Sequence, residues 1–402
     1  MAENSVRERP DTDATGAAEV TVHGHTAPRF AAVRDAFVRN FAAQGEVGAA
    51  CCVYHHGEPV VDIHAGLADR ASARPWRADT LQLVFSATKG VTAACVLLLV
   101  ERGAIDLDAP VARYWPEFAA SGKEHIPVRW LLSHRSGLAA IEGTFTLDEA
   151  LSWQPVVQAL AAQAPLWEPG TKHGYHLRSY GWLLGELVRR VTGRSLGRFF
   201  AEEIAAPLGI EFWIGLPAAE EARVSTLIPP EPAPAEMQAL LDRLFAPDTI
   251  AGRAFTGPSN LFHYDEMWNR RALHAPELPS SNGIGTARAL ARLYASLVGA
   301  VDGVRTLRPD TVEAACAVQS DGPDAVLFLP TRFGLGFMLP PALAPSAGPA
   351  AFGHPGAGGS LAFADRTHGL GFGYVMNRMT LATAGDARAD ALVAAVYRAL
   401  DA

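Results

Sequence analysis

The 402-residue sequence predicts an α+β protein, in which an antiparallel sheet flanked by helices carries an inserted helical region. A helix pattern and two strand patterns occur near the start of the chain. Helical segments punctuated by proline fill the middle, and strand patterns followed by one helix return at the end. Because strands occur near both ends, we expect one sheet to be assembled from both ends of the chain.

The N-terminal third begins with a polar segment and continues into a helix and a hairpin. Residues 1–26 are rich in charged residues, Ala, Thr and Gly without a period, and are predicted to form a disordered leader. Residues 29–43 place apolar side chains at helical spacing, which is typical of a helix packed on a sheet. Two apolar runs, 47–54 and 59–65, flank the turn residues 55–58 and predict a β-hairpin.

The remaining elements divide the chain into two regions. We expect a sheet domain made of residues 27–110 and 283–402, and a mainly helical domain over residues 111–282 with loops at the substrate entrance. The segment 225–282 is rich in proline at its start and predicts long loops and short helices. Further expected elements are a helix over 182–191, strands over 335–339, 360–365 and 369–377, and a closing helix over 387–400.

Composition restricts the classes of partner. The formal net charge is −8 and no run of Lys and Arg is present, which argues against a nucleic-acid partner and favours a small-molecule substrate. The start of the chain has no apolar signal region, and the apolar run 91–100 is too short to cross a bilayer, so we expect no membrane association and a cytoplasmic location. Neither the four cysteines nor the histidines show the spacing of a metal site, so no metal or cofactor is expected. The oligomeric state is left open.

One short motif points to nucleophilic chemistry. Ser86 is followed three residues later by Lys89, just before an apolar helical run. Side chains at positions i and i+3 of a helix lie on one face, and a serine hydroxyl needs a nearby base to become a nucleophile. The chain has only 3 lysines, at 89, 123 and 172, against 31 arginines. A lysine at this position therefore indicates a need for an amine that can lose its proton, which arginine cannot supply.

The context of this motif resembles a known superfamily. The chain is similar to the serine β-lactamases and penicillin-binding proteins, in particular to the class C β-lactamase-like branch with family VIII carboxylesterases and lovastatin-type acyltransferases. The resemblance spans roughly residues 30–400 and implies a β-lactamase/transpeptidase-like fold. It rests on several short segments in the family's order, which are 84–90 (VFSATKG), 131–138 (LLSHRSGL), 167–177 (WEPGTKHGYHL), 207–209 (PLG), 283–287 (GIGTA), 333–337 (FGLGF) and 352–360 (FGHPGAGGS).

The resemblance implies a role for individual residues. Ser86 would be the nucleophile, Lys89 its activating base, and Tyr175 a second base that relays the proton to the leaving group. The backbone N–H groups of Ser86 and Ala357 would form the oxyanion hole. Substrate contacts are expected from three further residues, which are His354, Gly356 and His176.

Two departures from the family pattern bear on the substrate. The third position of the Y-x-N element is Leu177, so the amide that would hold the acylamino group of a β-lactam is missing. The lysine of the K-T-G element is replaced by His354, which leaves no permanent cation for the carboxylate of a β-lactam. Both changes favour an esterase over a β-lactamase.

The resulting prediction is a serine hydrolase that forms an acyl-enzyme on Ser86 and acts on small carboxylic esters. An acyltransferase with the same residues is the first alternative, because only the acceptor differs. A β-lactamase or D-amino-acid peptidase ranks below both, and an inactive binding scaffold ranks last because Ser86, Lys89 and Tyr175 are all present.

Overall fold

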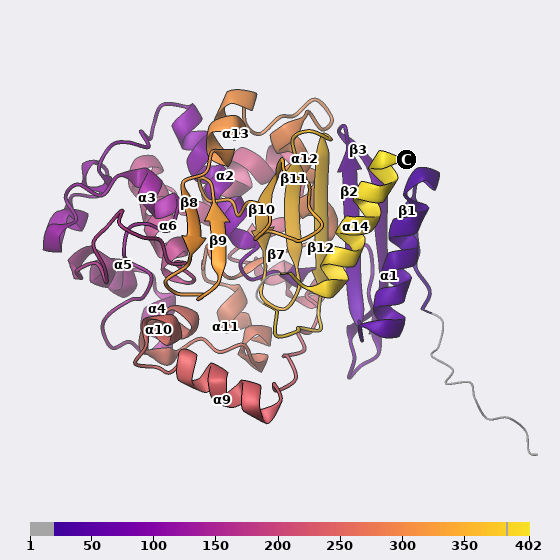
Figure 1. Ribbon diagram of the computed structural model, residues 1–402, viewed down its shortest axis with the longest axis horizontal. Helices are drawn as coiled ribbons and strands as arrows, with labels where there is room; N and C mark the ends of the chain where they lie inside the picture. Colours follow the sequence, from indigo (N-terminus) through magenta and orange to yellow (C-terminus); the bar gives the residue numbers. More distant parts are fainter. Residues whose placement is uncertain (1–19, 383–384) are drawn as a thin grey trace, which may run out of the picture.

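The largest element of the protein is a twisted antiparallel sheet with helices on both faces (Figure 1). The computed structural model describes residues 20–382 and 385–402. The strand order is β1-β3-β2-β12-β11-β10, and β4 pairs with β3 at one end. The strands are β1 (His23–Thr26), β2 (Gly48–His55), β3 (Glu58–Asp69), β4 (Arg74–Pro75), β10 (Ala351–Pro355), β11 (Leu361–Asp365) and β12 (Leu370–Met376).

The sheet joins the two ends of the chain, as the sequence predicts. Strand β2 of the N-terminal hairpin pairs antiparallel with β12, with Tyr54 opposite Gly371 and Ala50 opposite Val375. The predicted hairpin of 47–54 and 59–65 is therefore confirmed as β2 and β3, and it is extended by C-terminal strands. This pairing satisfies the backbone N–H and C=O groups that β2 would otherwise expose at the edge of the hairpin.

Three helices cover the faces of the sheet. Helices α1 (Ala31–Ala43) and α14 (Ala387–Asp401) lie side by side on one face (Figure 1). Helix α12 (Ala287–Val298) packs on β12, β2 and β11 from the other face. The faces of α1 and α14 that point to the sheet are apolar and buried, as at Phe37 and Leu392. Burial of one such side chain contributes about 1.5–3 kcal/mol to folding.

The middle of the chain forms a helical region around α2 (Thr88–Glu101). Twelve consecutive residues of α2, from Thr88 to Leu99, are buried, so this mostly apolar helix runs through the core. Helix α6 (Ser179–Thr192) packs on it. The other elements are β5 (Gln82–Leu83), α3 (Val128–Leu132), α4 (Leu147–Leu151), α5 (Gln154–Ala162), α7 (Leu196–Phe200), α8 (Ala206–Leu208), β6 (Phe212–Ile214), α9 (Ala235–Leu244), α10 (Ile250–Thr256), α11 (Arg271–His274), β7 (Gly283–Gly285), α13 (Pro309–Cys316), β8 (Ser320–Pro323) and β9 (Pro330–Phe333).

Several expectations about single elements are confirmed. The helices expected over 29–43, 182–191 and 387–400 correspond to α1, α6 and α14, and the strands expected over 360–365 and 369–377 correspond to β11 and β12. Segment 225–282 contains α9, α10 and α11 separated by long loops, as expected. No helix in the described parts of the chain is long and apolar enough to span a membrane. The domain boundaries at residues 110 and 282 stay a prediction.

Two expectations are wrong. The predicted leader extends to residue 26, but His23–Thr26 form β1, which pairs with β3; residues 1–19 of that prediction lie outside the described residues. These four polar residues carry no apolar alternation, so only the free edge of β3 defines them as a strand. Segment 335–339 is not a strand; its Met338 makes two isolated bridges, to Phe333 and to Gly353. The chain bends at Gly336, where φ is +84° and a Cβ atom would collide with Ala93 and Tyr180.

Candidate active site

Ser86 occupies a tight turn between β5 and α2. The preceding Phe85 has a left-handed backbone with φ of +44°, a conformation that costs energy in a residue with a side chain. Thr88 holds this turn, because its Oγ1 atom donates to the carbonyl of Phe85 at 2.6 Å and accepts from the N–H of Gly283 at 2.8 Å. The turn places Ser86 at the start of α2, and Lys89 follows within the first turn of the helix.

The amine of Lys89 has three polar neighbours. Its Nζ atom lies 3.1 Å from Ser86 Oγ, 2.7 Å from the carbonyl oxygen of Leu177 and 3.0 Å from the carbonyl oxygen of Ser280. Carbonyl oxygens only accept hydrogen bonds, so two N–H groups of the amine are directed at them. In a neutral amine, the remaining position is a lone pair that faces the Ser86 hydroxyl. The geometry therefore suits a neutral lysine that accepts the proton of Ser86.

Tyr175 and His354 border the same site. The centre of the Tyr175 ring is 4.8 Å from Lys89 Nζ, and its hydroxyl oxygen is 3.4 Å from His354 Nε2. His354 Nδ1 donates to the carbonyl of Pro355 at 2.7 Å, so in the neutral ring Nε2 is an acceptor that faces Tyr175. Burial, together with the nearby Lys89, lowers the pKa of His354 to about 3, so this ring is neutral at pH 7.

The environment of Tyr175 favours the phenol over the phenolate. Burial raises the pKa of Tyr175 well above its ordinary value, and the hydrogen bond to Ser86 only partly opposes this effect. The resemblance implies a second base at this position, which would need a stabilised anion. The surroundings of the ring instead suit a neutral hydroxyl that donates one proton as it receives another.

Two backbone N–H groups next to the nucleophile have no acceptor among the described residues. They belong to Ser86 and Ala357, the pair that the resemblance assigns to the oxyanion hole. Their neighbours are engaged: the N–H of Gly356 donates to Ser360 at 2.7 Å, and that of Gly358 donates to Ala382 at 3.0 Å. Free N–H groups beside a serine nucleophile can stabilise negative charge on a substrate oxygen.

Ser86 lies at the wall of a cavity of about 200 Å³. The polar side chains at its wall are those of Ser86, Tyr175, Tyr264, Thr331 and His354, and none of the lining residues is charged at neutral pH. The segment expected at the substrate entrance contributes Phe255 and Tyr264. The apolar lining is completed by Leu177, Leu327, Leu329, Pro330, Met338, Pro341, Ala342, Pro345, Pro355, Ala357 and Gly385. Such a cavity suits an uncharged, apolar group.

Comparison with known proteins agrees with this site. A family model described as Beta-lactamase matches residues 34–396. The chain belongs to the beta-lactamase family. It is 37% identical over 369 residues to Esterase/beta-lactamase LipL of Mycobacterium tuberculosis (strain ATCC 25618 / H37Rv), which covers 89% of this chain and 83% of that protein. The resemblance inferred from the sequence motifs is confirmed.

Other proteins similar to this chain include a carboxylesterase and an acyltransferase. A crystal structure of a family VIII carboxylesterase superimposes with a TM-score of 0.85 at 39% identity, covering 94% of this chain and 100% of that one. Monacolin J acid methylbutanoyltransferase of Aspergillus terreus is 31% identical over 159 residues, which is 34% of this chain and 38% of that protein. The β-lactamase/transpeptidase-like fold is thereby confirmed.

Two residues that the family resemblance assigns to substrate binding do not line the cavity beside Ser86. His176 is fully buried; its Nδ1 atom donates to the carbonyl of Gly174 at 2.6 Å, and its Nε2 atom accepts from the N–H of Leu138 at 3.1 Å. Burial lowers the pKa of His176 to about 4, so this ring is a neutral structural element. Gly356 packs against the carbonyl of Val84 instead of facing the cavity. The position of His176 does not support its predicted role as a substrate ligand.

Arg178 is a buried arginine near the site that no sequence motif indicates. The side chain of Arg178 carries no carboxylate partner among the described residues, and its guanidinium carbon lies 5.0 Å from the ring centre of Trp268 and 5.2 Å from that of Tyr264. Burial lowers the pKa of Lys89 well below its ordinary value, and the charge of Arg178 lowers it further. The only signal in the sequence was its place directly after the Tyr175-His176-Leu177 element.

Proposed function

We propose that this protein is a serine carboxylesterase that forms an acyl-enzyme on Ser86 and acts on small, uncharged esters. The observation that carries the proposal is the position of Lys89 Nζ, 3.1 Å from Ser86 Oγ, with its other hydrogen-bonding directions occupied by carbonyl oxygens. The esterase and the family VIII carboxylesterase among the relatives support the reaction type.

The reaction would proceed in two halves. Lys89 takes the proton of Ser86 as Oγ attacks the ester carbonyl carbon, and the N–H groups of Ser86 and Ala357 hold the oxygen that becomes negative. The C–O bond to the alcohol then breaks: Tyr175 gives its hydroxyl proton to the departing oxygen and receives the proton that Lys89 took from Ser86, so Lys89 is neutral again in the acyl-enzyme. In the resting enzyme the Tyr175 hydroxyl lies 3.4 Å from His354 Nε2, which can accept its hydrogen bond. Water attacks the acyl-enzyme by the reverse sequence and releases the acid.

A matched pair of variants tests this proposal. Intact-protein mass spectrometry after brief exposure to p-nitrophenyl butyrate should show a butyryl adduct on the wild type and on Ser152→Ala, whose hydroxyl lies on the surface, but none on Ser86→Ala. Ser86→Ala should also release no p-nitrophenol above the uncatalysed rate. Folded wild-type protein that is neither acylated nor active on a series of esters would refute the esterase proposal.

An acyltransferase is the second candidate, favoured by the apolar lining of the cavity and by the partial match to an acyltransferase. An apolar cavity limits the access of water to the acyl-enzyme. Addition of a primary alcohol should accelerate p-nitrophenol release and yield the new ester if transfer dominates, whereas pure hydrolysis leaves the rate unchanged. A chromogenic cephalosporin measures any β-lactamase activity in the same assay.

The cytoplasmic location and the absence of a nucleic-acid partner stay predictions from the sequence.

A further inference from the structure

Arg388, at the start of α14, is a buried arginine whose N–H groups are all engaged. Its side chain is 1% exposed. Nε donates to Asp386 at 3.1 Å, Nη1 donates to Glu46 at 3.0 Å and to the carbonyl of Arg378 at 2.9 Å, and Nη2 donates to Asp386 at 3.0 Å and to the carbonyl of Gly358 at 2.7 Å. A guanidinium has five N–H donors in a rigid planar fork. Because each donor has an acceptor, the orientation of this fork is set.

One of these acceptors belongs to the loop that holds the candidate oxyanion hole. The carbonyl of Gly358 follows Ala357, whose N–H is one of the two free donors beside Ser86. The next residue, Gly359, has φ of +128°, and a Cβ atom there would lie 2.6 Å from Arg388 Nη2 and 2.8 Å from Asp386 Oδ2. The loop backbone therefore rests directly on the Arg388–Asp386 pair, an arrangement that only glycine permits.

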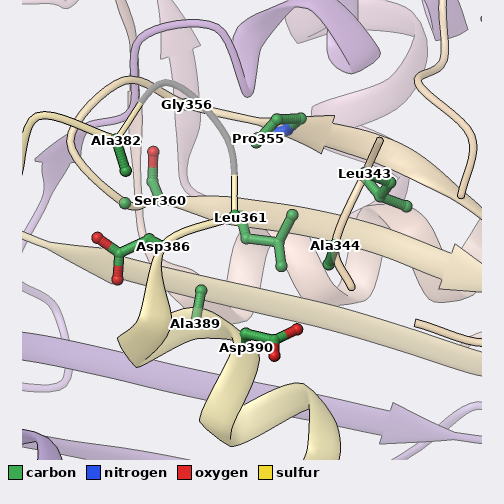
Figure 2. Close-up of a pocket in the computed structure, with 12 residues that line it drawn as sticks. Leu343, Ala344, Pro355, Gly356, Ser360, Leu361, Ala382, Asp386, Ala389 and Asp390 are labelled. Carbon is green, nitrogen blue, oxygen red and sulfur yellow. The ribbon is translucent and has the colours of Figure 1, made fainter. Parts of the chain in front are cut away.

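Little space separates this loop from the start of α14. Figure 2 shows the two segments on opposite sides of a small cavity, with Gly356 and Ser360 on the loop and Asp386 on the helix side. Its volume of about 10 Å³ accommodates one water molecule at most. The loop and the start of α14 therefore lie close together, and the hydrogen bond from Arg388 to the Gly358 carbonyl connects them.

The opposite end of the arginine is anchored to the sheet. Glu46 lies just before β2, its carboxylate is fully buried, and it accepts hydrogen bonds from Arg388 and from the hydroxyl of Tyr374 on β12. Thr380 donates to Asp386 at 2.7 Å, which fixes the second carboxylate. Arg388 thus connects the loop 356–360, which contains the Ala357 donor of the candidate oxyanion hole, to two central strands and to the first turn of α14.

We propose that Arg388 is a positioning residue that sets the direction of the Ala357 N–H through the carbonyl of Gly358. This inference rests on the proposed function, because it assigns Arg388 to the oxyanion hole of that reaction. Donors in such a site act only when they lie about 2.7–3.1 Å from the developing oxyanion. A rotation of the Gly358 carbonyl would turn the adjoining backbone and move the donor away.

The test is Arg388→Lys, which keeps the charge and removes the fork. We expect kcat for p-nitrophenyl butyrate to fall about 10- to 100-fold with KM within about twofold, because a donor displaced by a fraction of an ångström weakens transition-state binding only. The inhibition constant of phenylboronic acid, which forms a tetrahedral adduct on serine, should rise by the same factor as kcat/KM falls. A purely structural role would lower the melting temperature and leave both values unchanged in the folded protein.

The control is Arg190→Lys on α6, whose arginine pairs with Glu186 and Glu117 away from the site; it should retain wild-type values. Folded Arg388→Lys with wild-type kcat and boronate affinity would overturn the inference. If this variant does not fold, the same boronate measurement is made on Glu46→Gln, whose amide has one oxygen in place of the two that accept from Arg388 and Tyr374. An unchanged affinity of this variant overturns the inference. Failure of the proposed function is recognised separately, because the wild type would then neither turn over ester nor bind the boronic acid.

Discussion

Lys89 Nζ lies 3.1 Å from Ser86 Oγ and shares its remaining hydrogen bonds with the carbonyls of Leu177 and Ser280. These carbonyls come from the helical region, so the base is oriented by residues far from it in the sequence. In the part of the chain that the structure describes, no carboxylate lies among its hydrogen-bond partners. The site therefore favours the neutral amine, which is the form that can take a proton from serine.

Replacement of Lys89 by arginine should abolish this proton transfer. A guanidinium keeps its charge at any practical pH, so Lys89→Arg should lower kcat/KM for p-nitrophenyl butyrate by about 100- to 10,000-fold. The matched control is Lys123→Arg, because Lys123 is also fully buried and donates to the carbonyl of Ala120 at 2.8 Å. Steady-state kinetics on folded protein decide the outcome, and retention of more than about a tenth of wild-type activity by Lys89→Arg would contradict the role of base.

Removal of the charge of Arg178 should shift the pH dependence of the reaction. Because the positive charge of Arg178 disfavours protonated Lys89, Arg178→Met should raise the pKa of Lys89 and move the acidic limb of the kcat/KM profile to higher pH. Activity should then be reduced near neutral pH and recover in alkaline buffer. Arg189→Met is the control, since Arg189 also lies over an aromatic ring, that of Trp153, at 5.3 Å. An unshifted profile in Arg178→Met would show that this charge does not act on Lys89.

Asp324 anchors Tyr175 and one wall of the cavity. Its Oδ1 atom accepts from the N–H groups of Tyr175, Val326 and Leu327 at 3.0, 2.8 and 2.9 Å. Asp324→Ala leaves these donors unpaired, so we expect a loss of about 3 kcal/mol or more in the free energy of unfolding and a reduced kcat. Denaturant unfolding measures the first and ester kinetics the second.

Two further variants serve as controls for Asp324→Ala. Asp324→Asn should recover most of the stability because its amide oxygen can still accept. Asp321→Ala, which removes an exposed pair with Arg332, should cost less than about 1 kcal/mol. Equal effects of Asp321→Ala and Asp324→Ala would argue against the anchoring role.

Glu46 should make stability depend on pH. Burial raises the pKa of Glu46 from 4.5 to about 7, and Arg388 and Tyr374 only partly offset this effect, while Asp386 adds to it. Between these pH values the folded protein holds a proton that the unfolded chain has lost, so this group's contribution decreases as pH rises from 4.5 to 7. The slope is about 1.4 kcal/mol per pH unit at most.

Glu46→Gln lacks this titration. The difference in unfolding free energy between the wild type and Glu46→Gln should therefore shift in favour of the variant as pH rises through this window. Urea unfolding at several pH values between 4.5 and 7 measures the difference. A difference that is constant over the window would show that Glu46 is ionised throughout.

The regular elements of the fold could be predicted because their own side chains define them. The apolar run of β2, the alternating burial along β3 and the helical stripe of α1 each depend on neighbours within one short window. Strand β1 and the bend at Gly336 could not be predicted in this way. The first is defined by the free edge of β3, and the second by contact with α2, and neither leaves a pattern in its own segment.

The candidate site also has residues that the sequence predicts correctly and one whose position it does not predict. Ser86, Lys89 and Tyr175 lie in short motifs, and the structure brings all three together at one cavity or directly beside it. His176 lies next to Tyr175 in the sequence, yet its ring points to Leu138 and Gly174 and away from the cavity. Sequence proximity to a site residue did not predict the direction of a side chain.

By itself, the sequence determined the family, the order of the elements and the serine-lysine pair. The pair could be predicted because side chains at i and i+3 of a helix meet whatever the rest of the chain does. Only the tertiary structure decided which groups act on that pair: the carbonyls around Lys89, the charge of Arg178, and the connection from Glu46 through Arg388 to Gly358. These contacts join segments up to 342 residues apart. Their strength depends on burial and on distances of about 3 Å, which exist only once the chain has folded.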